Sequence, residues 1–341
     1  MSGKKILFLN PFREYISWFC TDAGRQKCRE YGFQLDCPAA DGDLGRDYDW
    51  KKIIGDYDAL VTTWGSPVCS ADFLKAAPRV QIIGHCAGSV VAVTDQTTYQ
   101  TPVHVTTANP VMAEAVAEWS LMATLIAQRN PGVYAAFGHG TRMNWQKARC
   151  GIADIHAMTI GIWGMGDVSH HLLKLLQPLR PGRILVCSGH AAEEELLPYH
   201  AEKCTFEQLF AESDVIHCLS GVNRSTYRKV GTREFDSMKS DAVFINGGRS
   251  RLCDQNALLA ALHSGKIRAV LDVFDEEPLP DDSPFYDLDN VLLTPHNAGY
   301  SGYHRYLPFL LDEFHRFFNG EPLLAEITEK RFMSMTDEHL R

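Results

Sequence analysis

Nine short, continuously apolar segments recur along the 341-residue chain, and stretches with helical spacing lie between most of them. A strand that is apolar at every position is buried on both faces, which is typical of a parallel sheet covered by helices. Alternation of such strands with helices predicts βαβ units and a doubly wound parallel sheet. The expected strands span residues 4–10, 58–64, 80–86, 159–165, 183–188, 214–220, 242–248, 267–274 and 291–295.

Two long helices are expected to divide this alternation into two domains. The first helix begins around Asn109, a good N-cap residue, and has Pro110 at its first helical position. It ends before the Asn130-Pro131-Gly132 stop signal. The second helix follows the last strand, within residues 301–322, and returns the chain to the first domain. The sequence therefore predicts an α/β protein with two Rossmann-like, doubly wound parallel-sheet domains and an interdomain cleft, one domain from residues 1–107 plus 300–341 and the other from residues 108–299.

Composition narrows the class of partner. The formal net charge of −9 argues against nucleic acid or an anionic membrane surface as the main partner. No uninterrupted apolar run of about 18 residues suggests a membrane span, and the N-terminal segment suits a first strand better than a signal peptide. None of the ten cysteines forms a C-x-x-C pair. Several lie in apolar runs, which indicates buried free thiols in a reducing cytoplasm and no metal site.

The segment GIWGMGDVS (161–169) follows an apolar strand and precedes a helical pattern. Gly164 and Gly166 fit the dinucleotide fingerprint G-x-G-x-x-G, but Ser169 stands where the third glycine belongs. Such glycines let backbone N–H groups approach a pyrophosphate at a helix N-terminus. A plain turn between strand and helix is the alternative. The expected cofactor-binding residues here are Gly164, Met165, Gly166, Asp167 and Val168.

The end of the next strand predicts which dinucleotide is preferred. A carboxylate there would hold the adenosine ribose and repel a 2′-phosphate, but the chain has Ser188, which can bond either ribose. No arginine follows Ser188, and three glutamates occupy residues 193–195. NAD(H) is therefore expected to be preferred, while NADP(H) stays possible.

The C-terminal half carries three ordered motifs, NGGRS (246–250), LDVFDEEPL (271–279) and NVLLTPHNAG (290–299). With the loop at 161–169, they make roughly residues 80–320 resemble the D-isomer-specific 2-hydroxyacid dehydrogenase family. The resemblance implies an NAD(P)-dependent oxidoreductase that interconverts a 2-oxo acid and a D-2-hydroxy acid by hydride transfer. It also implies that residues 1–107 plus 300–341 bind the substrate, that residues 108–299 bind the dinucleotide, and that the protein is a homodimer. The cytoplasmic location is expected from the cysteines alone.

By the same resemblance, Arg249, Glu277 and His296 form the catalytic set. The chemistry of these side chains agrees, because an arginine offers a bidentate fork to a substrate carboxylate and carbonyl. Imidazole is suited to acid–base catalysis near neutral pH. Glu277 is expected to hydrogen-bond His296, fix its orientation and favour its protonated form.

The resemblance supplies further site candidates. It implies that Asp272 accepts a hydrogen bond from the nicotinamide carboxamide, with Gly248 and Gly299 as additional cofactor-binding positions. The segment CAGSVVAVTD (86–95) stands where the family holds the substrate carboxylate on backbone amides, and it matches only in part. The substrate-binding candidates, besides Arg249 and His296, are Trp64, Ala87, Gly88 and Ser89.

Two other interpretations stay open. A dinucleotide-sensing regulatory or scaffold protein of the same fold, like the corepressor relatives of the family, would suit the irregular loop with Asp167, Ser169 and Ser188. The three catalytic-type side chains oppose that interpretation. A formate-dehydrogenase-like enzyme would need glutamine before the proline–histidine pair at 295–296, where the chain has Thr294.

Overall fold

The computed structural model describes residues 3–127, 129 and 153–335. These residues form two compact units. The first unit runs from the N-terminus to Ala113 and resumes at Tyr300, and the second runs from Glu114 to Gly299. The boundary between them falls within helix α4 (Asn109–Ala127). Each unit is built around one sheet whose paired strands are all parallel.

The first unit contains a five-stranded sheet in the order β2-β1-β3-β4-β5. Its strands are β1 (Lys5–Phe8), β2 (Gln34–Asp36), β3 (Ala59–Thr62), β4 (Ile82–His85) and β5 (His104–Thr107). Its other helices are α1 (Arg13–Phe19), α2 (Asp22–Tyr31), α3 (Ala71–Leu74), α12 (Tyr303–Phe318) and α13 (Glu329–Met333), with 3₁₀ turns at Trp50–Lys52, Ile54–Asp56, Thr98–Gln100 and Tyr300–Gly302.

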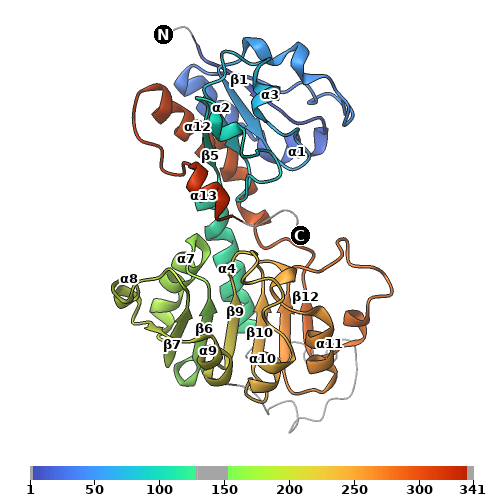
Figure 1. Ribbon diagram of the computed structural model, residues 1–341, viewed down its shortest axis with the longest axis vertical. Coiled ribbons are helices and arrows are strands. Elements are labelled where there is room, and N and C mark those ends of the chain that lie inside the picture. The colour runs from blue at the N-terminus through green and yellow to red at the C-terminus, as the bar shows by residue number, and fades with distance from the viewer. Residues whose placement is uncertain (1–2, 128, 130–152, 336–341) are drawn as a thin grey trace. The chain divides into compact units, whose positions relative to one another are not determined.

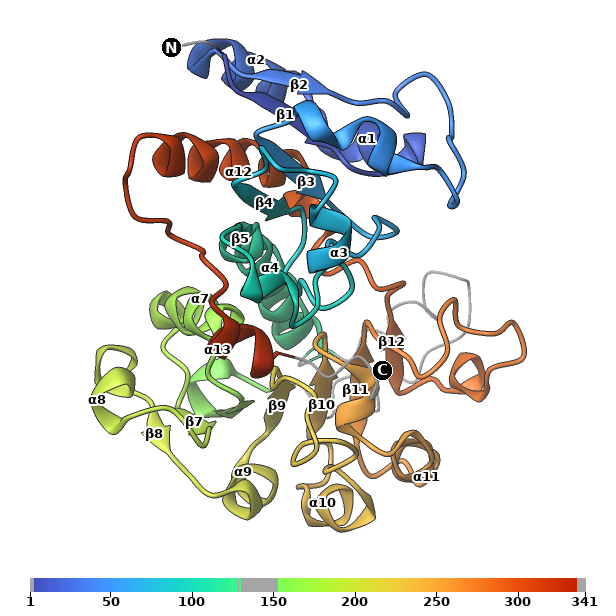
Figure 2. The same cartoon turned by 45° about the horizontal axis from the view of Figure 1, so that its top comes forward.

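Helices from both ends of the chain cover one face of this first sheet. Phe8 of β1, Phe19 of α1 and Leu310 of α12 are buried in one apolar cluster. Helices α2 and α12 lie side by side (Figures 1 and 2), and Lys27 Nζ lies 2.5 Å from Asp312 Oδ2 although 285 residues separate them. The helix expected after the last strand thus completes the first unit.

The second unit contains a seven-stranded sheet in the order β12-β11-β10-β9-β6-β7-β8. Its strands are β6 (Thr159–Trp163), β7 (Arg183–Cys187), β8 (Glu202–Lys203), β9 (Val215–Cys218), β10 (Val243–Asn246), β11 (Arg268–Leu271) and β12 (Val291–Leu293). Its helices, besides most of α4, are α7 (Asp167–Leu176), α8 (Glu193–Leu196), α9 (Phe206–Glu212), α10 (Thr232–Ser237) and α11 (Gln255–His263), with 3₁₀ turns at Ile155–Ala157, Gln177–Leu179, Leu197–Tyr199, Ser250–Leu252 and Pro284–Asp287.

Alternate residues of β9 show how this sheet is covered on both faces. Ile216 and Cys218 belong to a buried cluster that includes side chains from α9, α10 and α11. His217 points to the opposite face, where its Nε2 lies 2.8 Å from Thr124 Oγ1 of α4. Complete burial lowers the pKa of His217 to about 3, so this histidine is neutral and structural.

The predicted fold class is confirmed, and each of the nine expected strands is present in a shorter form. Three strands were missed, namely β2, β5 and β8. All three lie at sheet edges, where a strand is less enclosed and its sequence is less apolar. The expected stop of the first long helix, Asn130-Pro131-Gly132, lies outside the described residues.

Helix α4 is, among the described residues, a helix long and apolar enough to cross a membrane by length and composition. This helix was not singled out from the sequence as a membrane span, because Glu114 and Glu118 interrupt its apolar run. About half of the apolar window (56%) is buried inside the structure, and the core helix of a soluble protein passes the same test.

Candidate active site and dinucleotide-binding loop

The glycine-rich segment forms a tight turn between β6 and α7. Gly164 has a φ of +106°, and a Cβ atom on it would lie 2.8 Å from the backbone N and Cα of Ser220. Only glycine fits both constraints. Gly166 is the N-cap residue of α7, and a Cβ atom built on it meets nothing within 4 Å. The first glycine therefore serves packing, and the second borders open space at the start of a helix.

Ser169 closes this turn from inside the helix. Its side chain is buried, and its Oγ donates a hydrogen bond to the carbonyl oxygen of Gly164 at 3.0 Å. The serine that departs from the fingerprint therefore stabilises the loop. Exposed backbone at Gly166 and partly buried Met165, Asp167 and Val168 surround the helix N-terminus. This arrangement fits an anionic dinucleotide, whose pyrophosphate is favoured by free N–H groups and the helix dipole.

Ser188 follows β7, which lies next to the glycine loop because the Gly164 N–H donates to the carbonyl oxygen of Cys187 at 2.9 Å. The Ser188 Oγ accepts hydrogen bonds from the backbone N–H groups of His190 and Ala191, both at 3.3 Å. Lys203 of β8 donates to the Ala191 carbonyl at 2.7 Å. Lys203 was not identified from the sequence, because it lies far along the chain from Ser188. The pairing of β8 with β7 brings Lys203 to the turn after Ser188.

His296 and Glu277 come from separate loops and form a close pair. Nδ1 of His296 lies 2.6 Å from Oε2 of Glu277, and Oε1 of Glu277 accepts from the Phe274 N–H at 2.9 Å. Burial acts to raise the pKa of Glu277, but these hydrogen bonds and the nearby charge of Arg249 hold that pKa below its ordinary value. His296 stays 54% exposed, so its ring can reach a ligand.

The backbone around His296 is held in an unusual conformation. His296 has a φ of +49°, a left-handed conformation that is costly outside glycine and that clusters at functional sites. Fully buried Asp272 holds this loop by accepting from Thr294 Oγ1 at 2.5 Å and from the N–H groups of Asn297 and Ala298 at 2.9 and 3.0 Å. Burial raises the pKa of Asp272, against the three hydrogen bonds. Asp272 therefore positions the histidine loop, a part that sequence reasoning did not give it.

Arg249 stands at the end of a loop that follows β10. Buried Asn246 braces this loop, since its Nδ2 donates to the Arg249 carbonyl at 3.0 Å and its Oδ1 accepts from the Gly248 N–H at 3.1 Å. Trp119 of α4 covers the loop so closely that a Cβ atom on Gly247 would lie 2.5 Å from its ring. These contacts set the place of Arg249, and sequence spacing alone did not identify them.

A charged network supports the segment that carries Glu277. Asp275 Oδ2 lies 3.1 Å from Arg228 Nη2 and 3.1 Å from Arg251 Nη1. The Asp275 N–H donates to Gln255 Oε1 at 3.1 Å. None of these residues was a sequence-based candidate, because the partners come from three separate segments with no common spacing.

The structure brings most of the predicted site residues of the second unit to loops at the carboxyl ends of its parallel strands. Gly299, partly buried, is the last residue of this unit and follows the Asp272-bound Ala298. A Cβ atom on Gly248 would lie 2.7 Å from the Cys218 carbonyl oxygen, so Gly248 serves close packing. Within the described ranges, no group of three or more His, Cys, Asp or Glu side chains is arranged to hold a metal ion.

The other substrate candidates belong to the first unit. Trp64 packs against Phe19 and Tyr303, with ring centroids 6.1 and 5.8 Å apart. Ala87 and Gly88 are buried in the loop after β4, where Thr107 Oγ1 bonds their carbonyl oxygens. Ser89 is partly buried beside them. Trp64 therefore packs in an aromatic cluster of the first unit.

The comparisons with known proteins agree with this geometry. Residues 121–298 match the model of the D-isomer specific 2-hydroxyacid dehydrogenase NAD binding domain. A glyoxylate reductase of Korarchaeum cryptofilum is 30% identical over 260 residues, which cover 74% of this chain and 77% of that protein. The glyoxylate/hydroxypyruvate reductase B of Cronobacter sakazakii is 40% identical over 147 residues, 42% of this chain. That match covers 44% of the bacterial relative, less than half of its length.

A crystal structure of a phosphoglycerate oxidoreductase from Rhizobium etli has the same fold. It superposes with a TM-score of 0.77 at 26% identity, covering 95% of this chain and 97% of that one. The fold was predicted from the alternation of apolar strands and helices and the family from the ordered motifs, and both are confirmed. This chain belongs to the D-isomer specific 2-hydroxyacid dehydrogenase family, a family of NAD-binding oxidoreductases.

Proposed function

We propose that the protein is an NAD(P)-dependent oxidoreductase that interconverts a small 2-oxo acid and the corresponding D-2-hydroxy acid. The observation that carries this proposal is the His296–Glu277 pair at 2.6 Å, with the charge of Arg249 acting on the same carboxylate. The names of the relatives point to glyoxylate and hydroxypyruvate as the first substrates to test. In this account the second unit binds the dinucleotide, and the first unit supplies substrate contacts at Trp64 and residues 87–89.

The side chains have separate parts in the proposed reaction. The bound nicotinamide supplies or accepts the hydride. Arg249 binds the carboxylate and polarises the carbonyl of the 2-oxo acid. Because Nδ1 of His296 is engaged by Glu277, Nε2 is the ring nitrogen that delivers a proton to the carbonyl oxygen as it becomes a hydroxyl. Glu277 orients the ring and stabilises its protonated form, and Asp272 positions the loop.

A panel of 2-oxo acids, each with NADH and NADPH, tests the proposal. The expected result is oxidation of the reduced dinucleotide with glyoxylate or hydroxypyruvate at rates well above those without an acid. Tight dinucleotide binding without turnover across the panel would favour the alternative of a dinucleotide-sensing protein. Absence of dinucleotide binding would contradict both.

Replacement of Glu277 by glutamine is expected to shift the pH profile of 2-oxo acid reduction. The hydrogen bonds that lower the pKa of Glu277 keep it ionised into acidic solution, and an ionised partner favours the protonated imidazole that reduction needs. Glutamine carries no such charge. The alkaline limb of kcat/KM for reduction should therefore move toward acid in Glu277→Gln. An unchanged profile in a folded variant would remove Glu277 from this role.

For the cofactor, we propose a modest preference for NADH, by about 10-fold in kcat/KM, or about 1.4 kcal/mol. Ser188 can bond a ribose hydroxyl but does not repel a 2′-phosphate, and the exposed glutamates at 193–195 disfavour added negative charge. Ser188→Asp should sharpen the preference for NADH. Gly189→Arg should reverse it, since Gly189 is exposed and a side chain there meets nothing within 4 Å.

Steady-state kinetics with both dinucleotides at a fixed 2-oxo acid check this order. Lys203→Ala is the matched control, because Lys203 is the basic side chain already at this turn. If the parent favours NADPH and Lys203→Ala removes that preference, the assignment to Ser188 is wrong.

We also propose that the protein is a homodimer, as the family resemblance implies. Met122 and Leu125 of α4 are each 40% exposed, and apolar exposure of this kind on a long helix supports an association surface. Sedimentation of the purified protein measures the assembly.

A further inference from the structure

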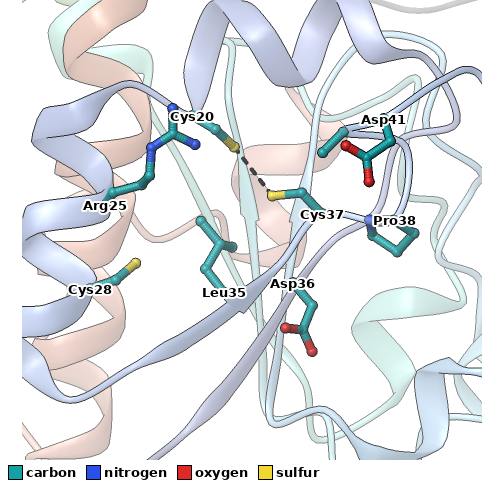
Figure 3. Close-up of a pocket in the computed structure, with 9 residues that line it drawn as sticks. Cys20, Arg25, Cys28, Leu35, Asp36, Cys37, Pro38 and Asp41 are labelled. Carbon is teal, nitrogen blue, oxygen red and sulfur yellow. Dashed lines mark hydrogen bonds between the residues drawn. The ribbon is translucent and has the colours of Figure 1, made fainter.

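A cavity of about 530 Å³ opens on the first unit, beside α2 and the loop after β2 (Figure 3). Three cysteines line it, and each comes from a different stretch of chain. Cys20 caps the end of α1, Cys28 lies in α2, and Cys37 directly follows β2. Exposed Arg25 and Asp41 stand at its rim, so the cavity is open to solvent.

Two of these thiols are close neighbours. The Sγ atoms of Cys20 and Cys37 lie 3.5 Å apart, and Figure 3 shows the two side chains pointing toward each other. Both are free in the structure. A disulfide has a sulfur–sulfur distance of about 2.05 Å, so the pair needs to close by roughly 1.5 Å. Both residues lie just beyond the end of a helix or strand.

The two thiols are not equivalent. The hydrogen bond with Cys20 and the charge of Arg25 lower the pKa of Cys37, against burial, which acts to raise it. The same hydrogen bond and burial raise the pKa of Cys20. Burial raises the pKa of Cys28 to about 11. Cys37 is also only partly buried, whereas Cys20 and Cys28 are buried. A thiolate is the reactive form of cysteine, so lower pKa and greater access both favour Cys37 as the first thiol to react.

We propose that Cys37 and Cys20 form a peroxide-sensitive dithiol site, in which Cys37 is oxidised first and Cys20 resolves it to a disulfide. The Cys37 thiolate attacks one oxygen of hydrogen peroxide, forming a sulfenic acid as the O–O bond breaks. The departing hydroxide takes up a proton as water. The Cys20 thiol then attacks the sulfenic sulfur, forming the S–S bond and releasing a second water. Two thiols are oxidised, and one peroxide is reduced to two waters.

Trypsin separates the three cysteines, which makes the site directly measurable. Cys20 falls in peptide 14–25, Cys28 in peptide 28–29 and Cys37 in peptide 30–46. After peroxide treatment of the folded full-length protein, the expected product is a link between peptides 14–25 and 30–46 that dithiothreitol reverses. Before oxidation, iodoacetamide should modify Cys37 at least about 10-fold faster than Cys28.

Single substitutions distinguish the role of Cys37, which is oxidised first, from that of Cys20, which resolves it. Cys20→Ser should give no link and should carry a sulfenic acid on Cys37 that dimedone captures. Cys28→Ser, from the same cavity, is the matched control and should form the link at the parent rate. A link from Cys37 to Cys28, or three thiols that stay reduced while the protein is folded, would overturn the proposal. Because the measurement is a mass and not an activity, it is independent of the proposed reaction.

Discussion

Replacing His296 with alanine is expected to lower kcat for 2-oxo acid reduction by about 10²-fold or more. The variant loses the proton donor of the proposed site, which Glu277 orients at 2.6 Å and whose ring is exposed. The affinity for the dinucleotide should stay near the parent value, because the glycine loop follows β6 whereas His296 follows β12. Exposed His263→Ala, at the end of α11, is the control and should behave like the parent.

Arg249→Ala should lose activity to a similar extent, about 10²-fold, with a marked rise in KM for the 2-oxo acid. The guanidinium is the cation of this site, and its charge already acts on Glu277. Steady-state kinetics together with a dinucleotide titration distinguish the two variants. Either variant retaining a tenth or more of the parent kcat/KM would remove that residue from the catalytic set.

Gly166→Val is expected to abolish measurable dinucleotide binding while the protein stays folded. The new side chain projects into the open space at the N-terminus of α7, where the pyrophosphate is proposed to lie. Gly166 has an extended backbone, with a φ of −117°, which valine adopts without strain. Calorimetric titration with NADH measures the loss, and a thermal melt followed by circular dichroism measures the fold.

Valine substitutions at two other glycines are the comparisons for Gly166→Val. Gly164→Val should destabilise the protein itself, because its left-handed backbone and the 2.8 Å approach to Ser220 leave no room for a side chain. Gly42→Val, in the first unit and with nothing within 4 Å of its Cβ position, should change neither property. Tight NADH binding by folded Gly166→Val would mean that the glycine segment is only a turn.

Much of the fold could be predicted because parallel strands that are buried on both faces have continuous apolar sequences. The strands that escaped prediction, such as exposed Glu202–Lys203 of β8, pair at a sheet edge and carry no such run. Their pairing depends on the neighbouring strand, which a local pattern does not contain. The glycine segment was predicted from its place between strand and helix, although the role of buried Ser169 in closing the turn was not.

The candidate site also contains residues that the sequence predicted and residues that it did not. Arg249, Glu277 and His296 were proposed from ordered motifs, and the structure brings Glu277 and His296 into contact. The residues that hold them were missed, because Asn246 and Asp275 act through long-range contacts with no sequence period. Asp272 was assigned to the nicotinamide by resemblance, which stays a prediction, and the structure shows in addition that its oxygens accept hydrogen bonds from the histidine loop. Support of this kind comes from tertiary packing and is visible only in the folded chain.

The stereochemistry of the product tests the central claim most directly. Hydroxypyruvate is suited to this test because its reduction creates a chiral centre, whereas reduction of glyoxylate does not. The purified protein is incubated with NADH and hydroxypyruvate, and the glycerate formed is separated by chiral chromatography. The account predicts one D-glycerate for each NADH oxidised, at a rate that His296→Ala does not approach. L-glycerate, a racemic product, or a parent rate no higher than that of His296→Ala would contradict it.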